Sequence, residues 1–146
     1  MASTLHLDIT KHIATVTMLA PTMPPVFFQE LRDCFQTISN SADVRAVVLR
    51  SEAKSFSYGL DLVAAFKEHG PLFAAGGASE RSQLLALIAD LQDCLSTVVR
   101  CPVPVIAAIH GHCIGGGVDL ISCCDIRLAT TDATFSIRET RIAMVA

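Results

Sequence analysis

Residues 111–119 read GHCIGGGVD, and this stretch decides the fold. The apolar run Val105–Ile109 precedes it and the apolar run Val118–Cys123 follows it, which predicts a strand, a glycine-rich turn and a short buried helix. Such a turn presents backbone N–H groups that no carbonyl within the helix accepts, and anions bind there readily. The alternative is a tight turn that needs small residues only for packing. Physical reasoning alone leaves both readings open.

The spacing of these glycines excludes two common nucleotide-binding motifs. A dinucleotide fingerprint that begins at Gly115 would need its third glycine at Leu120. A phosphate-binding loop that begins at Gly111 would need its lysine at Gly117. The turn therefore suits a single oxyanion better than a polyphosphate, because it offers amides without a lysine.

A second glycine turn, Phe56–Leu62, follows the predicted buried strand Ala46–Leu49. Gly59 lets the backbone turn and expose the amide of the next residue, Leu60. Two such turns at one edge of a sheet would supply a pair of amides to one oxygen, and we state this geometry as a hypothesis. Asp61 is expected to cap the helix that follows rather than to act in catalysis.

Strands and helices alternate along the rest of the chain, which predicts an α/β fold. Apolar periodicity predicts a helix that ends near Ser39 and another that Ser82 caps and that ends near Val99. The Gly- and Ala-rich segment Gly70–Ser79 is expected to be flexible surface chain. Val105–Ile109 is expected to be covered on both faces, as continuous apolar strands are. The other predicted strands are Leu5–Ile9 and Ile13–Met18, which form a hairpin, Ile126–Ala129 and Ala133–Ile137.

Composition excludes several classes of protein. The chain has 146 residues, is 51% hydrophobic and carries a net charge of −3, which is enough for one core and offers no concentrated basic patch for nucleic acid. The apolar stretches 103–109 and 113–118 are too short to span a membrane. No basic and apolar targeting segment is visible at the N-terminus. The cluster of Cys101, His110, His112 and Cys113 lacks the spacings of structural zinc sites, so we expect no metal. The six cysteines are expected to be reduced thiols, because the chain is too large and apolar to need disulfides and shows no secretion signal.

Three motifs together resemble the signature of the crotonase (enoyl-CoA hydratase/isomerase) family. They are SFSYGLDL at 55–62, CPVPVIAAIHG at 101–111 and IGGGVDL at 114–120, and the segments 124–129 and 133–136 agree in order and spacing. The resemblance implies a ClpP/crotonase-like spiral of ββα units. It also implies that residues 1–146 form the N-terminal core domain of a longer member, without its C-terminal helices. An acyl-CoA substrate, no further cofactor, a homo-oligomer (trimer or hexamer) and a mitochondrial or peroxisomal location are likewise implied.

The resemblance also implies roles for individual residues. The thioester oxygen would be held by the backbone amides of Leu60 and Gly116. Hydratases of the family usually carry two glutamates where this chain has Asp119 and Glu139, and the aspartate–glutamate pattern is that of dienoyl-CoA isomerases. Glu139 would shuttle the proton and Asp119 would orient the diene. Further substrate contacts are implied for Ser57, Tyr58, Gly59, Asp61, Gly115 and Gly117.

The leading hypothesis is therefore a dienoyl-CoA isomerase of fatty-acid β-oxidation. The alternatives are an enoyl-CoA hydratase and a non-catalytic fragment that binds acyl-CoA or partner subunits. A third acid of the isomerases would fall one position beyond Ala146, so we expect this chain to be weakly active at most. Without the family's C-terminal helices the chain would expose apolar core surface, so we also expect it to self-associate. Glu139 has a structural reading as well, because Arg138 and Arg141 flank it. The family's early asparagine–alanine pair is replaced here by the proline-rich stretch around Met23.

Overall fold

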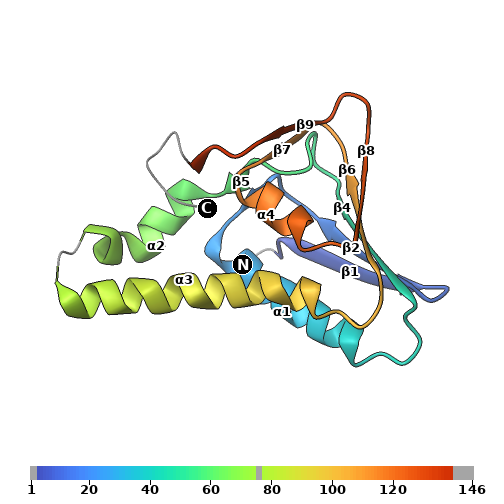
Figure 1. Cartoon of the computed structure of the whole chain (residues 1–146), viewed down its shortest axis with the longest axis horizontal. Coiled ribbons are helices and arrows are strands. Elements are labelled where there is room, and N and C mark those ends of the chain that lie inside the picture. Colours follow the sequence, from blue (N-terminus) through green and yellow to red (C-terminus); the bar gives the residue numbers. More distant parts are fainter. Residues whose placement is uncertain (1–2, 75–76, 140–146) are drawn as a thin grey trace.

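The structure is a computed structural model that describes residues 3–74 and 77–139. Its centre is a five-stranded sheet in the order β1-β2-β4-β6-β8 (Figure 1). β1 and β2 pair antiparallel and the other neighbours pair parallel. The strands are β1 (Leu5–Thr10), β2 (Ile13–Met18), β4 (Ala46–Ser51), β6 (Val105–Ile109) and β8 (Ile126–Ala129).

The predicted hairpin at the start of the chain is confirmed, and two residues connect its strands. Lys11 and His12 both have positive φ, at 50° and 68°. Two-residue hairpin turns of this kind match the right-handed twist of the strands they join. Because neither residue is glycine, contacts from outside the turn help to hold it: the His12 carbonyl accepts the Arg45 N–H at 2.8 Å.

Helices cover one face of the sheet (Figure 1). α1 (Pro25–Ser39) buries an apolar stripe that includes Phe27, Leu31 and Phe35, and it packs against α3 (Ala78–Val99). Alternate residues of β6 face this core, whereas Ile106 and Ala108 on the opposite face are only half-buried. The expectation that β6 is covered on both faces was therefore wrong, since the described helices lie on one side of the sheet.

α2 (Leu62–Ala74) and the first half of α3 extend away from the sheet as an arm (Figure 1). The expectation that Gly70–Ser79 is flexible chain is wrong for the described residues of this segment, because α2 continues through Gly70 and α3 begins at Ala78. Ser82 is not the cap of α3: the N-cap is Gly77, and the Ser82 hydroxyl donates to the Ala78 carbonyl inside the helix at 3.0 Å.

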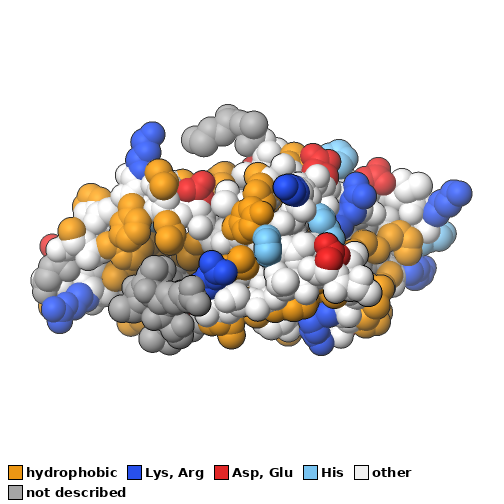
Figure 2. Space-filling model, turned by 90° about the horizontal axis from the view of Figure 1, so that it is seen from above, with side chains coloured by type: hydrophobic (Ala, Val, Ile, Leu, Met, Phe, Trp, Pro, Cys, Tyr) orange, Lys and Arg blue, Asp and Glu red, His pale blue; other side chains and the backbone are white. Residues whose placement is uncertain are grey.

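The arm carries much of the exposed apolar surface, and hydrophobic side chains gather at this end of the molecule in Figure 2. α2 has no buried residue, and Phe66 and Phe73 contact each other with ring centroids 5.2 Å apart. By length and composition alone α3 is apolar enough to cross a membrane. It also packs against α1, where Arg32 and Asp90 form an ion pair at 2.7 Å.

A second, smaller layer of parallel strands builds the edge that carries the candidate site. β3 (Thr22–Met23) pairs with β5 (Gly59–Leu60), and β7 (His112–Ile114) pairs with β9 (Thr134–Ser136). A parallel bridge between Ser57 and Cys113 joins the two pairs. Because all these segments run in the same direction, the residues that follow each strand meet at one edge of the layer.

Candidate active site

The first turn at this edge exposes the amide of Leu60. Gly59 has φ of +84°, a left-handed conformation that glycine adopts without strain. The Tyr58 N–H donates to the Pro21 carbonyl at 2.6 Å, and the Asp61 N–H donates to the Met23 carbonyl at 3.0 Å. The turn is therefore held to the segment around β3 on both sides of Leu60.

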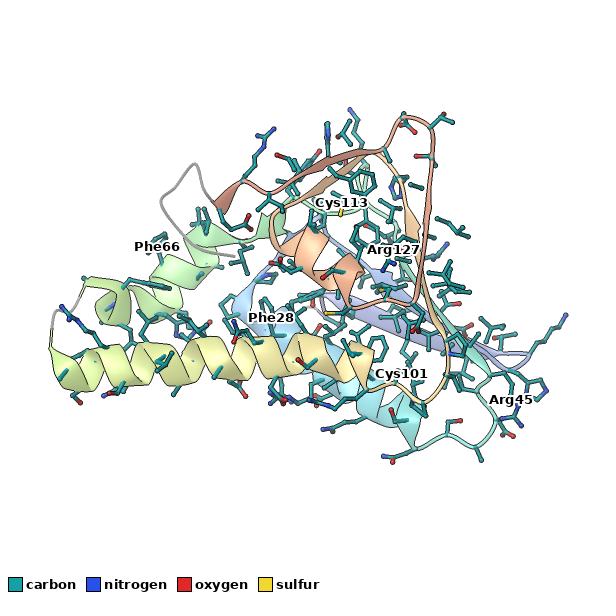
Figure 3. All side chains as sticks on the ribbon, in the orientation of Figure 1. Phe28, Arg45, Phe66, Cys101, Cys113 and Arg127 are labelled. Carbon is teal, nitrogen blue, oxygen red and sulfur yellow. The ribbon has the colours of Figure 1, made fainter. Side chains whose placement is uncertain are left out.

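The second turn brings a free amide to the same place. Gly115 has φ of 55° and ψ of −129°, which only glycine adopts readily, and its N–H donates to the Ser136 carbonyl at 2.9 Å. Gly116 is the first residue of α4 (Gly116–Ser122). The first N–H groups of a helix have no carbonyl partner within it. At the other end of α4, Arg127 (Figure 3) donates to the carbonyls of Ile121 and Cys124 at 3.2 and 2.6 Å.

The two turns are in contact. A methyl group on Gly59 would lie 2.9 Å from the Ile114 carbonyl oxygen and 3.1 Å from the Gly116 nitrogen. A methyl group on Gly116 would in turn lie 3.8 Å from the Leu60 nitrogen. The structure thus brings together the two amides that the sequence pointed to, and the closeness leaves no room for a side chain at Gly59.

A cleft of about 260 Å³ opens beside these turns. Of the expected substrate contacts, Tyr58, Gly59 and Gly115 line it, together with Leu60. The cleft is mostly apolar because two further aliphatic side chains, Leu62 and Ile114, share its wall with the turns. Its full lining is Tyr58, Gly59, Leu60, Leu62, Ile114, Gly115, Arg138 and Glu139.

Three of the expected substrate contacts instead support the turns. Ser57 is fully buried, and its hydroxyl accepts the Gly59 N–H at 3.0 Å and donates to the Pro21 carbonyl at 3.3 Å. Gly117 packs against Ser57, where a methyl group would lie 2.7 Å from the Ser57 Cβ. Asp61 Oδ1 accepts the Ala64 N–H at 2.9 Å, which confirms the predicted cap of α2.

Glu139 places a carboxylate on the wall of the cleft. A methyl group on Gly115 would lie 2.6 Å from Glu139 Oε1, so the carboxylate rests directly against the second turn. Its Oε2 atom is buried and has no hydrogen-bond partner among the described residues. Buried polar atoms without partners are rare in folded proteins, and at a functional site they indicate a group that awaits a proton or a ligand.

Asp119 lies near Glu139 but does not line this cleft. It is half-buried on α4, one turn after Gly115, whose carbonyl accepts the Asp119 N–H at 3.4 Å. Desolvation raises the pKa of Asp119 above its ordinary value, and the negative charge of Glu139 raises this pKa further. The Asp119 carboxyl therefore holds its proton more readily than a solvated carboxyl does.

Sequence reasoning missed three wall residues: Leu62, Ile114 and Arg138. Arg138 had been considered only as a charged neighbour of Glu139, and Arg141 lies outside the described residues. The signal for Leu62 and Ile114 was their position directly beside the two glycine turns. Sequence adjacency to a turn predicts proximity to the site, although it does not say which way a side chain points.

Two histidines near the second turn contact neighbouring segments. His110 Nε2 lies 2.8 Å from the Ala53 carbonyl oxygen, and His112 Nδ1 lies 2.6 Å from Thr134 Oγ1. Within residues 3–74 and 77–139, no cluster of three His, Cys, Asp or Glu side chains is arranged to hold a metal.

All six cysteines are free. Cys94, Cys113 and Cys124 are buried, and the other three are partly buried. Desolvation raises the pKa of Cys113, labelled in Figure 3, to about 11 and is the largest cause that raises the pKa of Cys124 to about 12. These two groups are therefore neutral thiols near pH 7, and neutral thiols are poor nucleophiles.

Comparison with known proteins identifies relatives of the chain. Residues 8–146 match the enoyl-CoA hydratase/isomerase family. The mitochondrial Delta(3,5)-Delta(2,4)-dienoyl-CoA isomerase of Mus musculus is 42% identical over 140 residues, which is 93% of this chain and 43% of that protein. The peroxisomal enzyme of the same name from Arabidopsis thaliana is 40% identical over 122 residues, 82% of this chain and 44% of that protein. An enoyl-CoA hydratase/carnithine racemase structure from Magnetospirillum magneticum has a TM-score of 0.85 at 33% identity, covering 100% of this chain and 53% of that one.

The chain spans less than half the length of these two isomerases. The resemblance drawn from the three sequence motifs is confirmed, and so is the crotonase fold, since solved structures of that fold align along the whole chain. The family match covers nearly every described residue, including both glycine turns and Glu139. The chain belongs to the enoyl-CoA hydratase/isomerase (crotonase) family.

Proposed function

We propose that this chain carries the thioester-binding site of an acyl-CoA isomerase that moves the double bonds of a dienoyl-CoA. One observation carries the proposal: the amide-bearing turns at Leu60 and Gly116 meet beside the Glu139 carboxylate, whose buried Oε2 has no hydrogen-bond partner within residues 3–74 and 77–139. The names of the mouse and Arabidopsis relatives support this substrate class.

In this proposal the two amides stabilise an enolate. Removing a proton from the carbon next to a thioester moves an electron pair onto the thioester oxygen, and two N–H donors held in place bind that oxygen more strongly as its charge grows. Removing one such donor typically raises the barrier by about 2.7–4 kcal/mol. The turns are suited to this role because neighbouring backbone groups hold both of them in place.

Glu139 is the proposed base. Its carboxylate takes the proton from the carbon next to the thioester, the double bonds shift, and a proton returns to the far end of the diene, so that the reaction consumes no redox equivalent. Asp119 would orient or polarise the diene from the other side of the pocket. Desolvation and the nearby charge of Glu139 raise the pKa of Asp119, which is consistent with a place beside the same pocket.

The apolar wall of the cleft suits the acyl part of such a substrate. Leu60, Leu62 and Ile114 offer apolar surface beside the amides, and Tyr58 adds its ring. In this arrangement Gly59 and Gly115 are proposed to contact the thioester through their backbones. Ser57, Asp61 and Gly117 act indirectly, because they hold the two turns in place.

An enoyl-CoA hydratase is the second candidate, because a protein named as such from Magnetospirillum magneticum shares this fold at 33% identity. Hydration requires a water molecule between two carboxylates, and the shorter side chain at Asp119 makes this less favourable. Incubation with a dienoyl-CoA and, separately, with an enoyl-CoA tests the choice. Migration of the conjugated-diene absorbance supports the isomerase, whereas water addition to the enoyl-CoA alone contradicts it.

The cellular compartment and the oligomeric state are part of the same proposal. The two isomerases named above are mitochondrial and peroxisomal, and we extend these compartments to this chain as alternatives. We also propose a homo-oligomer. If the chain binds acyl-CoA tightly but turns over neither substrate, it is a binding or assembly unit rather than an enzyme by itself.

A further inference from the structure

Met23, the second residue of β3, contacts both residues whose amides form the proposed oxyanion site. Its side chain is buried, with 1% exposed. A methyl group on Gly116 would lie only 2.6 Å from Met23 Cε, so the end of the Met23 side chain rests directly against Gly116. The Met23 backbone pairs with Leu60, and the Met23 carbonyl accepts the Asp61 N–H at 3.0 Å.

The residues around Met23 restrict its backbone. The Pro21 carbonyl accepts the Tyr58 N–H at 2.6 Å, which fixes the segment on one side of Met23. On the other side Pro24 has φ of −69° and precedes Pro25, the first residue of α1. Proline rings fix φ, so few free rotations remain between the core helix α1 and Met23.

We propose that Met23 is a positioning residue that sets the separation of the Leu60 and Gly116 amides; this inference rests on the proposed function. A methionine side chain is flexible and fills irregular gaps, which suits a contact between a strand and a glycine turn. Misplacement of a catalytic group by about 1 Å can lower a rate roughly a hundredfold. Removal of the Met23 side chain lets Gly116 move toward the vacated space, away from the shared oxygen.

The test uses the thioester carbonyl of bound hexanoyl-CoA, isotope-labelled at the carbonyl carbon and observed by infrared difference spectroscopy on this chain. Hydrogen bonds from two amides weaken the C=O bond, so the stretching frequency of the thioester carbonyl is expected to fall when hexanoyl-CoA binds to the wild-type chain. Met23→Ala is expected to lose most of this lowering while its affinity for hexanoyl-CoA changes little. In an active protein with this site, kcat falls roughly tenfold to a hundredfold and KM stays within about threefold.

Met18→Ala is the matched control, because Met18 is also fully buried but lies in β2, away from the cleft. It makes the same truncation in the core and is expected to keep the full frequency lowering. Met23→Leu retains most of the buried volume without the terminal methyl, so it gives an intermediate result if Met23→Ala does not fold. Met23→Ala combined with Gly116→Ala places a methyl in the vacated space and is expected to restore part of the lowering.

Three outcomes overturn the inference. A folded Met23→Ala that keeps the full lowering shows that Met23 does not position the amides. An equal loss in Met18→Ala shows a general loosening of the core. A wild-type chain that binds hexanoyl-CoA without any lowering removes the proposed oxyanion site itself, and this result is distinguishable from the other two because it appears before any substitution is made.

Discussion

The edge that carries the glycine turns and the helix α2 that follows it differ in how deeply their side chains are buried. At the edge, Ser57 and Met23 are buried, and the turns touch through backbone atoms. Along α2 no side chain is buried, and Val63 is 81% exposed. We therefore expect the glycine turns to tolerate few substitutions, whereas most positions along α2 should tolerate many.

The largest expected effect comes from the carboxylate at the edge. Glu139→Gln keeps the size of the side chain but removes the base, so turnover in an active protein that carries this site should fall by roughly 10²–10⁴. Acyl-CoA binding should change far less. Paired measurements of kcat and of acyl-CoA affinity check this, and near-normal turnover would remove Glu139 from the proton-shuttle role.

A pair of glycine substitutions sharpens the comparison between the edge and the arm. Gly59→Ala adds a methyl at φ of +84°, within 3.1 Å of the Gly116 nitrogen, and should lower turnover by roughly 10²–10³ and the free energy of unfolding by about 1–3 kcal/mol. Gly70→Ala on α2 meets no atom within 4 Å outside its chain neighbours, but it precedes Pro71, whose ring crowds a Cβ before it, so the free energy of unfolding should change by less than about 1 kcal/mol. Denaturant unfolding and turnover measurements on both variants check these expectations. Equal effects of Gly59→Ala and Gly70→Ala would contradict the expected difference between the edge and the arm.

The exposed apolar side chains of the arm should govern self-association of the chain rather than its catalytic activity. Phe66→Ser removes an exposed aromatic ring that is 53% accessible and contacts Phe73. Exposed apolar patches favour association, so the wild-type chain should self-associate and this variant should do so less. Light scattering over a range of concentrations measures the effect. A wild-type chain that stays monomeric would contradict the expectation.

The smallest expected effect is on the pH dependence of stability. The pKa of Asp119 is raised in the folded state, so its ionisation costs folding free energy as the pH rises through and above its ordinary value of 3.8. Asp119→Asn should therefore stabilise the fold at neutral pH, by no more than about 1 kcal/mol because water screens a half-buried group. The gain should disappear below that ordinary value. Thermal melts of the wild-type chain and of Asp119→Asn across this pH range measure the difference in stability. A stabilisation by Asp119→Asn that grew at acid pH would contradict this expectation.

The elements that could be predicted from sequence are those set by local chemistry. The capping role of Asp61 and the left-handed turn at Gly59 follow from residue type and spacing, and both are present. The end of α2 could not be predicted, because Gly70 and Pro71 usually interrupt a helix and here lie within one. α2 also contacts α3, and no pattern within α2 reveals that contact.

The candidate site was predictable only in part, for a related reason. Its amides lie in turns that glycine marks in the sequence, whereas the wall of the cleft depends on how distant segments meet. Arg138 lines the cleft because β9 runs beside β7, and Ser57 is hidden because the segment around it is covered on both sides. Such contacts join residues far apart along the chain, so side-chain direction at the site had to come from the structure.

The most direct test of the account is a crystal structure of the chain with a bound acyl-CoA. The account predicts that the thioester oxygen lies within about 2.7–3.1 Å of both the Leu60 and the Gly116 nitrogen, with the Glu139 carboxylate beside the carbon next to the thioester. A thioester bound elsewhere, or amides of Leu60 and Gly116 that face different surfaces, would contradict it.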